Sequence, residues 1–379
     1  MYAGRWIVML PLVVVMMSRP ALAGPFNQIV VFGDSLSDTG NAQEALGSLA
    51  IDPNDYYMGR FSNGPVWVEY LAEQLQLVPP VANLVSNSGR NYAFGGARTD
   101  GSGLVSLFIN DINEQVPDYL NNDGGPSGDE LIVVWGGAND FLDGETNVAV
   151  PVNNLASDIA DLHAAGGRNF MVVNLPLLGQ TPRYVGTSDE PVFDAISTSF
   201  NSRLDLSLDT LETTLSGVEF FRVDAASLIG GAVADPGAFG FTNVTDQALG
   251  LSGIDADEYL FWDDLHPTTV AHNLLAQSAA NVLFDALGVL AGDLDFDGFV
   301  GIEDLNRVLS QWNTSVTPGN PLFADPSGDG FVGIEDLNTV LGNWNAGTPP
   351  GAGSNIPEPG TAGVLVLGAI AGLCRRRKA

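Results

Sequence analysis

Short apolar runs alternate with longer amphipathic segments throughout residues 26–290, and this alternation restricts the fold more than any other feature of the sequence. Nearly continuous apolar runs are typical of strands buried on both faces, and helices between them connect parallel strands. The sequence therefore predicts an α/β fold with a parallel sheet between two layers of helices. The expected strands are residues 29–32, 131–135, 170–174 and 220–223, and the expected helices are 65–75, 105–120, 152–163, 195–215 and 268–287.

The two ends of the chain differ from this pattern. Arg5 precedes a short apolar run, and Ala21-Leu22-Ala23 places small residues at the -3 and -1 positions before Gly24. This pattern predicts a secretory signal peptide, residues 1–23. The alternative is a transmembrane anchor, but the apolar run is shorter than the roughly 20 residues that span a membrane. At the other end, residues 347–379 combine a Gly/Pro/Ser-rich linker, a short apolar stretch and a basic terminus.

Charge and cysteine content exclude several classes of function. The chain has 14 Lys and Arg residues against 45 Asp and Glu residues, a formal net charge of -31. Such a surface repels phosphate backbones, so we expect no nucleic-acid partner. Cys374 is the single cysteine, which excludes an intramolecular disulfide and argues against a cysteine-ligated zinc site or a thiol nucleophile.

A candidate nucleophile lies where the first expected strand ends. The run of residues 29–32 leads directly into Gly33-Asp34-Ser35-Leu36. Ligands bind at the carboxyl ends of strands in open α/β sheets, and the glycine permits a tight turn that presents the Ser35 hydroxyl there. The alternative is that Ser35 only caps a helix, a role that serine often has.

Three further segments favour catalysis over that alternative. Asp263 precedes His266 by three residues, close enough to hold one ring nitrogen while the other accepts the serine proton. Residues 91–97 contain Gly95 and Gly96, whose N–H groups no side chain shields, and Asn139 follows the expected strand 131–135. The glycine segments could separately be ordinary turns at strand ends.

Together these segments resemble the GDSL or SGNH hydrolase family over roughly residues 27–290, with lesser similarity at residues 59–64 and 174–176. The resemblance implies a flavodoxin-like α/β/α sandwich that hydrolyses carboxylic esters through an acyl-serine without a catalytic cofactor. It implies that Ser35 is the nucleophile, His266 the base and Asp263 its orienting partner. The implied oxyanion donors are the Ser35 and Gly96 N–H groups and the Asn139 amide, with Gly95 as an alternative to Gly96.

Two other histidines are weaker candidates for a direct role. His163 lies near the end of an expected helix, where a histidine complements the helix dipole. His272 lies six residues after His266, inside the last expected helix of the α/β domain. We expect neither to act in catalysis.

Residues 291–346 contain an acidic repeat with a period of 32 residues. Acids at loop positions 1, 3, 5 and 12 with glycine at position 6 form the oxygen cage of a calcium site. The alternative, an acidic linker, does not account for the duplication. The predicted calcium ligands are Asp293, Asp295, Asp297, Phe299 and Asp304 in the first loop, and Asp325, Ser327, Asp329, Phe331 and Asp336 in the second.

The repeat resembles a type I dockerin, which has a single helix after each loop and would make a small all-α module. The resemblance suggests a cohesin-like partner, but positions 10 and 11 are Ile302-Glu303 and Ile334-Glu335 instead of the usual small hydroxyl residues. The tail from Pro357 onward resembles the PEP-CTERM sorting signal of exported proteins in Gram-negative bacteria, which implies processing at the envelope.

These features predict an exported serine esterase or lipase: a signal peptide at 1–23, a hydrolase domain at 24–290, a calcium module at 291–346 and a linker with a sorting tail at 347–379. The expected substrate is an ester of a lipid or of an acylated carbohydrate. Two alternatives remain. One is a non-catalytic, calcium-dependent surface or adhesion protein on a hydrolase scaffold, and the other is an acetyl esterase that acts on polysaccharide.

Overall fold

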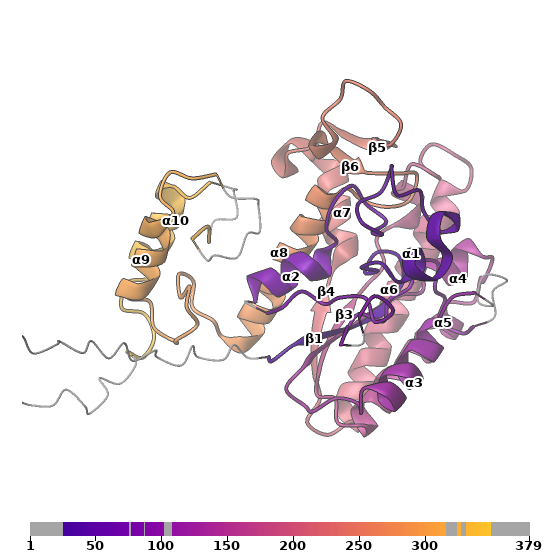
Figure 1. Cartoon of the computed structure of the whole chain (residues 1–379), viewed down its shortest axis with the longest axis horizontal. Coiled ribbons are helices and arrows are strands. Elements are labelled where there is room, and N and C mark those ends of the chain that lie inside the picture. The colour runs from indigo at the N-terminus through magenta and orange to yellow at the C-terminus, as the bar shows by residue number, and fades with distance from the viewer. Residues whose placement is uncertain are drawn as a thin grey trace, which may run out of the picture.

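A computed structural model describes residues 26–75, 77–86, 88–101, 108–315, 324–326 and 331–349 of the chain. At its centre is a four-stranded sheet of β1 (Ile29–Gly33), β2 (Leu131–Trp135), β3 (Asn169–Val173) and β4 (Glu219–Val223), in that order and all parallel (Figure 1). The four predicted strands are confirmed to within one residue. Every side chain of β1 and β2 is buried, which is why these segments are almost wholly apolar.

A short segment extends the sheet beyond β1. The Tyr92 N–H donates to the Val31 carbonyl at 2.8 Å, and the Phe94 N–H donates to the Gly33 carbonyl at 3.0 Å. These bonds place the glycine segment 95–97 beside the carboxyl end of β1, next to the turn that carries Ser35.

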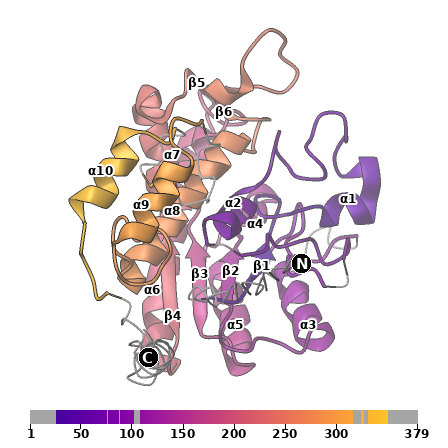
Figure 2. The same cartoon turned by 60° about the vertical axis from the view of Figure 1, so that its left-hand side comes forward.

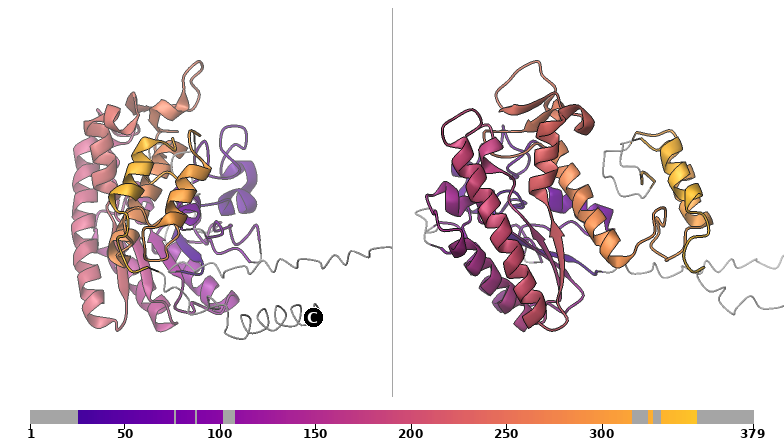
Figure 3. Two further views of the ribbon diagram at one scale, coloured as in Figure 1. Left: turned by 90° about the vertical axis from the view of Figure 1, so that its left-hand side faces the viewer. Right: turned by 180° about the vertical axis from the view of Figure 1, so that it is seen from behind.

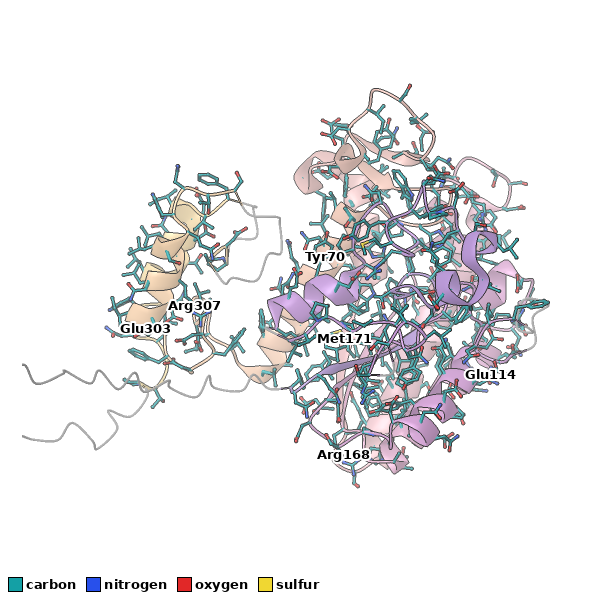
Figure 4. The ribbon with its side chains drawn as sticks, viewed as in Figure 1. Tyr70, Glu114, Arg168, Met171, Glu303 and Arg307 are labelled. Carbon is teal, nitrogen blue, oxygen red and sulfur yellow. The ribbon has the colours of Figure 1, made fainter. Side chains whose placement is uncertain are left out.

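Helices cover both faces of the sheet, as predicted (Figure 3). On one face α2 (Trp67–Gln74) packs against α8 (Thr269–Leu287), and on the other α3 (Ile112–Asn122), α5 (Ala149–Ala164) and α6 (Glu190–Thr214) pack side by side. Met171 of β3 lies in the core between these layers (Figure 4).

The helix predicted for residues 105–120 begins at Ile112 in the structure, and residues 102–107 lie outside the described chain. The Asp111 N–H donates to the Glu114 carboxylate at 3.3 Å, a capping arrangement that fixes the start of the helix. Several short elements were not predicted: α1 (Asn41–Leu46), α4 (Ala138–Leu142), α7 (Ala225–Ala234), a parallel pair β5 (Asn243–Gln247) and β6 (Tyr259–Phe261), and 3₁₀ turns at Gly47–Leu49, Leu178–Gln180, Pro236–Phe239 and Ala256–Glu258.

The acidic repeat forms two short helices, α9 (Ile302–Ser310) and α10 (Ile334–Gly342), beside the α/β unit (Figures 1 and 2). Glu303 and Arg307 lie one turn apart on α9 (Figure 4). A separate apolar cluster lies between the repeats, formed by Leu294, Val300, Val308, Ala324, Val332 and Val340. Among the described residues, we find no helix that is long and apolar enough to cross a membrane. The predicted signal peptide and sorting tail lie outside the described residues.

Candidate active site

Ser35 lies in the turn after β1, and Gly33 is the residue that makes this turn fit. A Cβ atom on Gly33 would lie 2.3 Å from the Trp135 carbonyl oxygen of β2, so only glycine permits this approach. Gln115 of α3 holds the turn by accepting from the Gly33 N–H and donating to the Gly33 carbonyl, both at 2.9 Å. The first helix after the turn, α1, starts at Asn41, so Ser35 is not its cap.

Ser35, His266 and Asp263 form one chain of hydrogen bonds. The Ser35 Oγ lies 2.8 Å from His266 Nε2, and His266 Nδ1 lies 2.7 Å from Asp263 Oδ2. A carboxylate only accepts, so the proton of the neutral ring belongs on Nδ1 and Nε2 is left to accept from the serine. The three residues therefore have the geometry in which a serine hydroxyl can be deprotonated.

The loop after β6 fixes the Asp263 carboxylate. Its Oδ1 accepts from the backbone N–H groups of Leu265 at 2.8 Å and of His266 at 2.6 Å. Burial opposes ionisation, but the adjacent His266 charge and these hydrogen bonds outweigh burial and hold the pKa of Asp263 well below its ordinary value. The Asp263 carboxyl group therefore stays ionised and can balance the positive charge that the imidazole gains when it takes a proton.

The predicted oxyanion donors lie in the two segments that border the Ser35 turn. The Gly95 N–H donates to Asp38 Oδ2 at 2.8 Å, whereas the Gly96 N–H has no hydrogen-bond partner among the described residues. Gly96 has a φ of 83°, a left-handed conformation that suits glycine. Asn139 Nδ2 donates to the Ala97 carbonyl at 2.9 Å, which fixes the amide and leaves it one further N–H.

Two residues of the first motif have structural roles that the sequence analysis missed. The buried Asp38 accepts from the N–H groups of Gly40 and Asn41, at 2.7 and 2.6 Å, as well as from Gly95. Asn41 Nδ2 donates to the carbonyls of Asn91 and Ala93, both at 2.9 Å. These bonds join the serine turn to the glycine segment. A run of polar residues directly after an apolar strand is the sequence signal that could have indicated them.

Tyr56 is a third residue that the sequence analysis missed. Its hydroxyl donates to Asp263 Oδ2 at 2.7 Å across 207 positions of sequence. The ring lies edge-on to Phe61 and Trp262, with centroids 6.4 and 6.5 Å away. Residues 52–58 form a loop without strand or helix, so no periodic signal marks Tyr56 in the sequence.

An apolar cavity, partly open to solvent, begins at Ser35, Asn139 and His266. It extends over the carboxyl ends of β2, β3 and β4, because its other walls come from the segments that follow those strands and from α7 and α8. Most of the lining is aliphatic: Leu36, Leu142, Leu175, Pro176, Leu177, Leu178, Ala225, Ile229, Leu265, Ala271 and Leu275.

Neither of the other histidines joins the hydrogen-bonded chain. His163 Nε2 lies 3.0 Å from the Ser216 carbonyl at an exposed position. His272 is buried, its Nδ1 accepts from the Trp67 N–H at 3.4 Å, and burial lowers its pKa to about 3. Both contacts are structural.

The first acidic loop gathers carboxylates that could hold a cation. Oxygens of Asp293, Asp295 and Asp297 lie within 4.8 Å of one another. Burial raises the pKa of Asp293 to about 6, with nearby acids adding to the effect. Asp304 accepts from the N–H groups of Leu294 at 2.6 Å and of Gly301 at 2.7 Å. An all-oxygen set of this kind fits Ca²⁺.

The second loop is described only in part. Asp336 is buried and accepts from the Gly333 N–H at 2.7 Å, the same contact that Asp304 makes in the first loop. Asp325 and Phe331 are described, whereas the predicted ligands Ser327 and Asp329 lie outside the described residues.

Comparison with known families finds one match that covers most of the chain. The family model described as "GDSL-like Lipase/Acylhydrolase" matches residues 29–279. This range includes the serine turn, both oxyanion segments and the Asp263–His266 loop, and it stops before the acidic repeat.

Curated relatives show lower similarity over the same region. Phosphatidylcholine-sterol acyltransferase of Aeromonas hydrophila is 28% identical over 320 residues, which cover 70% of this chain and 91% of the relative. Thermolabile hemolysin of Vibrio parahaemolyticus is 27% identical over 274 residues, which cover 66% of this chain and 62% of the relative.

Solved structures resemble the chain more distantly. A lipolytic protein of the G-D-S-L family from Veillonella parvula has a TM-score of 0.42 at 16% identity, covering 67% of this chain and 97% of its own. A catalytic mutant of the acetylxylan esterase Axe2 from Geobacillus stearothermophilus has a TM-score of 0.39 at 14% identity, covering 68% and 94%. Similarities of this size carry no conclusion about substrate.

Proposed function

The chain belongs to the GDSL-like lipase/acylhydrolase family and is a carboxylic ester hydrolase, and from this premise we propose that it cleaves esters through an acyl intermediate on Ser35. The observation that carries the proposal is the chain of bonds from Ser35 Oγ through His266 to Asp263, at 2.8 and 2.7 Å. These contacts supply a nucleophile, a base and a group that orients the base.

In the first half-reaction, the Ser35 oxygen forms a bond to the ester carbonyl carbon while His266 Nε2 takes the serine proton. Collapse of the tetrahedral intermediate breaks the bond to the alcohol, which leaves with that proton. In the second half-reaction, water gives its proton to His266 and attacks the acyl-serine, and Ser35 recovers a proton when the acid departs.

We assign the negative oxygen of the tetrahedral intermediate to the N–H groups of Ser35 and Gly96 and to the Asn139 amide. The bond from Gly95 to Asp38 supports Gly96 over Gly95, because the Gly95 N–H already has a charged acceptor. The Asn139 bond to Ala97 supports a donor that needs no reorganisation during the reaction.

The apolar cavity supports an acyl group longer than acetyl. Burying an aliphatic chain against leucine and isoleucine side chains contributes about 0.8 kcal/mol for each methylene group. An acetyl group has no chain to place there, so the polysaccharide acetyl esterase is the less favoured candidate. The non-catalytic surface protein is disfavoured by the complete chain of hydrogen bonds at Ser35.

Chromogenic esters of increasing acyl length test this function in one experiment. We expect hydrolysis by the wild-type protein, higher kcat/KM for acyl chains longer than acetyl, and loss of hydrolysis in Ser35→Ala with an unchanged melting temperature. A serine-directed phosphonate should label Ser35. Full activity of Ser35→Ala would exclude the mechanism, and a preference for acetyl would favour the acetyl esterase.

We also propose that the acidic loops bind structural Ca²⁺. One ion would be held by the first loop, through Asp293, Asp295, Asp297, Asp304 and the backbone carbonyl of Phe299 at loop position 7. A second ion would be held by the second loop, through Asp325, Ser327, Asp329, Phe331 and Asp336. The clustered carboxylates of the first loop support this assignment. The ion would supply folding energy to a dockerin-like module and has no place in the ester chemistry.

The repeat further suggests a protein partner of the cohesin type. Equivalent large apolar side chains in and directly after the two helices are half exposed: Ile302 and Ile334, Leu309 and Leu341, and Trp312 and Trp344. Sequence features outside the described residues suggest export across the inner membrane of a Gram-negative bacterium and envelope association through the tail. Sequencing of the secreted protein should then find Gly24 as its first residue.

A further inference from the structure

We propose that Tyr56 is a positioning residue for catalysis, and that residues 56–63, which we term the base strap, hold the Asp263–His266 pair in register with Ser35. The proposal rests on the proposed function and adds to it a role for a segment that lies about 200 positions before Asp263 and His266 in sequence.

The central contact is the hydroxyl of Tyr56 on the oxygen that His266 uses. Asp263 Oδ2 accepts from both Tyr56 and His266 Nδ1, each at 2.7 Å. Burial, with the neighbouring Asp263 charge, raises the pKa of Tyr56 well above its ordinary value, so the hydroxyl keeps its proton and remains a donor. With two N–H groups on Oδ1, the carboxylate is bonded on both oxygens and cannot rotate.

The rest of the base strap contacts His266 and the residues that follow it. The Phe61 ring lies against the imidazole with centroids 5.1 Å apart. Ser62 Oγ donates to the Pro267 carbonyl at 2.9 Å, and Asn63 Oδ1 accepts from the Thr269 N–H at 2.8 Å. With the Tyr56 contact, four residues of the base strap thus touch the segment from Asp263 to Thr269 that carries the base.

Removal of the Tyr56 hydroxyl therefore has two consequences. Asp263 loses one restraint on its orientation, which lowers the fraction of productive geometry. Its Oδ2 also loses a donor that competes with His266, which strengthens the interaction with the protonated ring. The other titratable or charged groups near this pair are unchanged by the substitution: Asp34, Asp55, His272, and the ion-paired Asp264 and Arg183.

The test is Tyr56→Phe in the full-length protein, with Tyr70→Phe as the matched control. Tyr70 lies on α2 (Figure 4), and its hydroxyl bonds to Thr269 Oγ1 at 2.7 Å without contacting Asp263. We expect Tyr56→Phe to lower kcat by about tenfold at nearly constant KM. We expect the acidic limb of kcat/KM against pH to move to higher pH. Tyr70→Phe should change neither quantity.

A double-mutant cycle with Asp263→Ala separates positioning from a general structural effect. Tyr56→Phe should have no further effect on kcat in the Asp263→Ala background, because the oxygen to which Tyr56 donates is already gone. An unmoved acidic limb, or an equal loss of kcat in both backgrounds, would overturn the proposal. Should Tyr56→Phe fail to fold, Phe61→Leu must show the same loss of kcat at constant KM. Failure of Ser35→Ala to abolish hydrolysis would instead contradict the proposed function.

Discussion

Four buried carboxyls lie around the nucleophile, and their hydrogen-bond partners separate their roles. Asp263 accepts from His266, Leu265 and Tyr56, and its pKa is held low. Burial instead raises the pKa of Asp34, Asp38 and Asp140 to about 6. Asp263 is therefore the carboxyl best suited to stay charged opposite a protonated imidazole.

Replacement of the Asn139 amide tests the oxyanion assignment. We expect Asn139→Ala to lower kcat by roughly 10² to 10³ with little change in KM, about the effect of one lost oxyanion donor. Asn154→Ala is a suitable control, because Asn154 Nδ2 donates to Thr99 Oγ1 at 3.0 Å outside the cavity. A silent Asn139→Ala together with a severe His272→Ala would show that the site is assigned wrongly.

Asp158 on α5 provides a test of stability that is independent of catalysis. The residue is buried, its Oδ2 has no hydrogen-bond partner among the described residues, and burial raises its pKa from 3.8 to about 7. The folded protein thus binds this proton more tightly than the unfolded chain does. That contribution to stability is complete below pH 3.8 and is lost as the pH rises through about 7.

Asp158→Asn removes a carboxylate that is unfavourable only when it is charged. We expect the free energy of unfolding in urea to rise by about 1–3 kcal/mol at pH 8 and to change little at pH 4. Asp285→Asn, at an exposed position of α8, serves as the control. An equal change at both pH values would contradict an ionisation effect.

At the scale of elements, the sequence predicted best what is buried and continuous. Strands β1 and β2 were found because both faces are covered and every position is apolar. The missed strand β5 is half exposed and mostly polar, so it resembles a loop. In the site, short sequence motifs mark Ser35 and His266. The role of Tyr56 depends on a contact across 207 positions, which no local sequence pattern indicates.

Helix α7 provides one wall of the acyl cavity through Ile229, which makes chain-length preference a property of that element. Ile229→Trp fills part of the cavity with a larger side chain and leaves the hydrogen-bonded chain at Ser35 unchanged. We expect kcat/KM for long-chain esters to fall at least about tenfold, while the acetyl ester changes by less than about twofold. Val192→Trp, on an exposed position of α6, should change neither. Equal losses for all esters would place the acyl chain elsewhere.

At the scale of the whole molecule, the two acidic repeats pair with each other through backbone hydrogen bonds. The Asn345 N–H donates to the Val300 carbonyl, and the Asn313 N–H donates to the Val332 carbonyl, both at 2.9 Å. Each loop is thus paired with the segment that follows the other helix. Neither repeat can bury its apolar face alone, and we expect the pair to fold as a unit.

Chelation should separate this unit from the hydrolase. The first loop brings Asp293, Asp295 and Asp297 within 4.8 Å of one another, and without a cation their repulsion opposes folding of a module with a small core. Calcium that binds only the folded form stabilises it by mass action. The α/β unit has its own large core, so we expect its stability to be independent of the ion.

We therefore expect a chelator to increase hydrogen exchange across residues 291–346 of the full-length protein, while hydrolysis by residues 24–290 continues.

Calorimetric titration should show two binding events of unequal affinity, because Ser327 leaves the second loop one carboxylate fewer. Asp297→Ala should remove the tighter event and Asp329→Ala the weaker one. Since ligand carboxyls must be ionised to bind the metal, and burial raises the pKa of Asp293 to about 6, calcium affinity should fall as the pH drops through that value. Loss of esterase activity on chelation, or no calcium uptake at all, would contradict this independence of the two units.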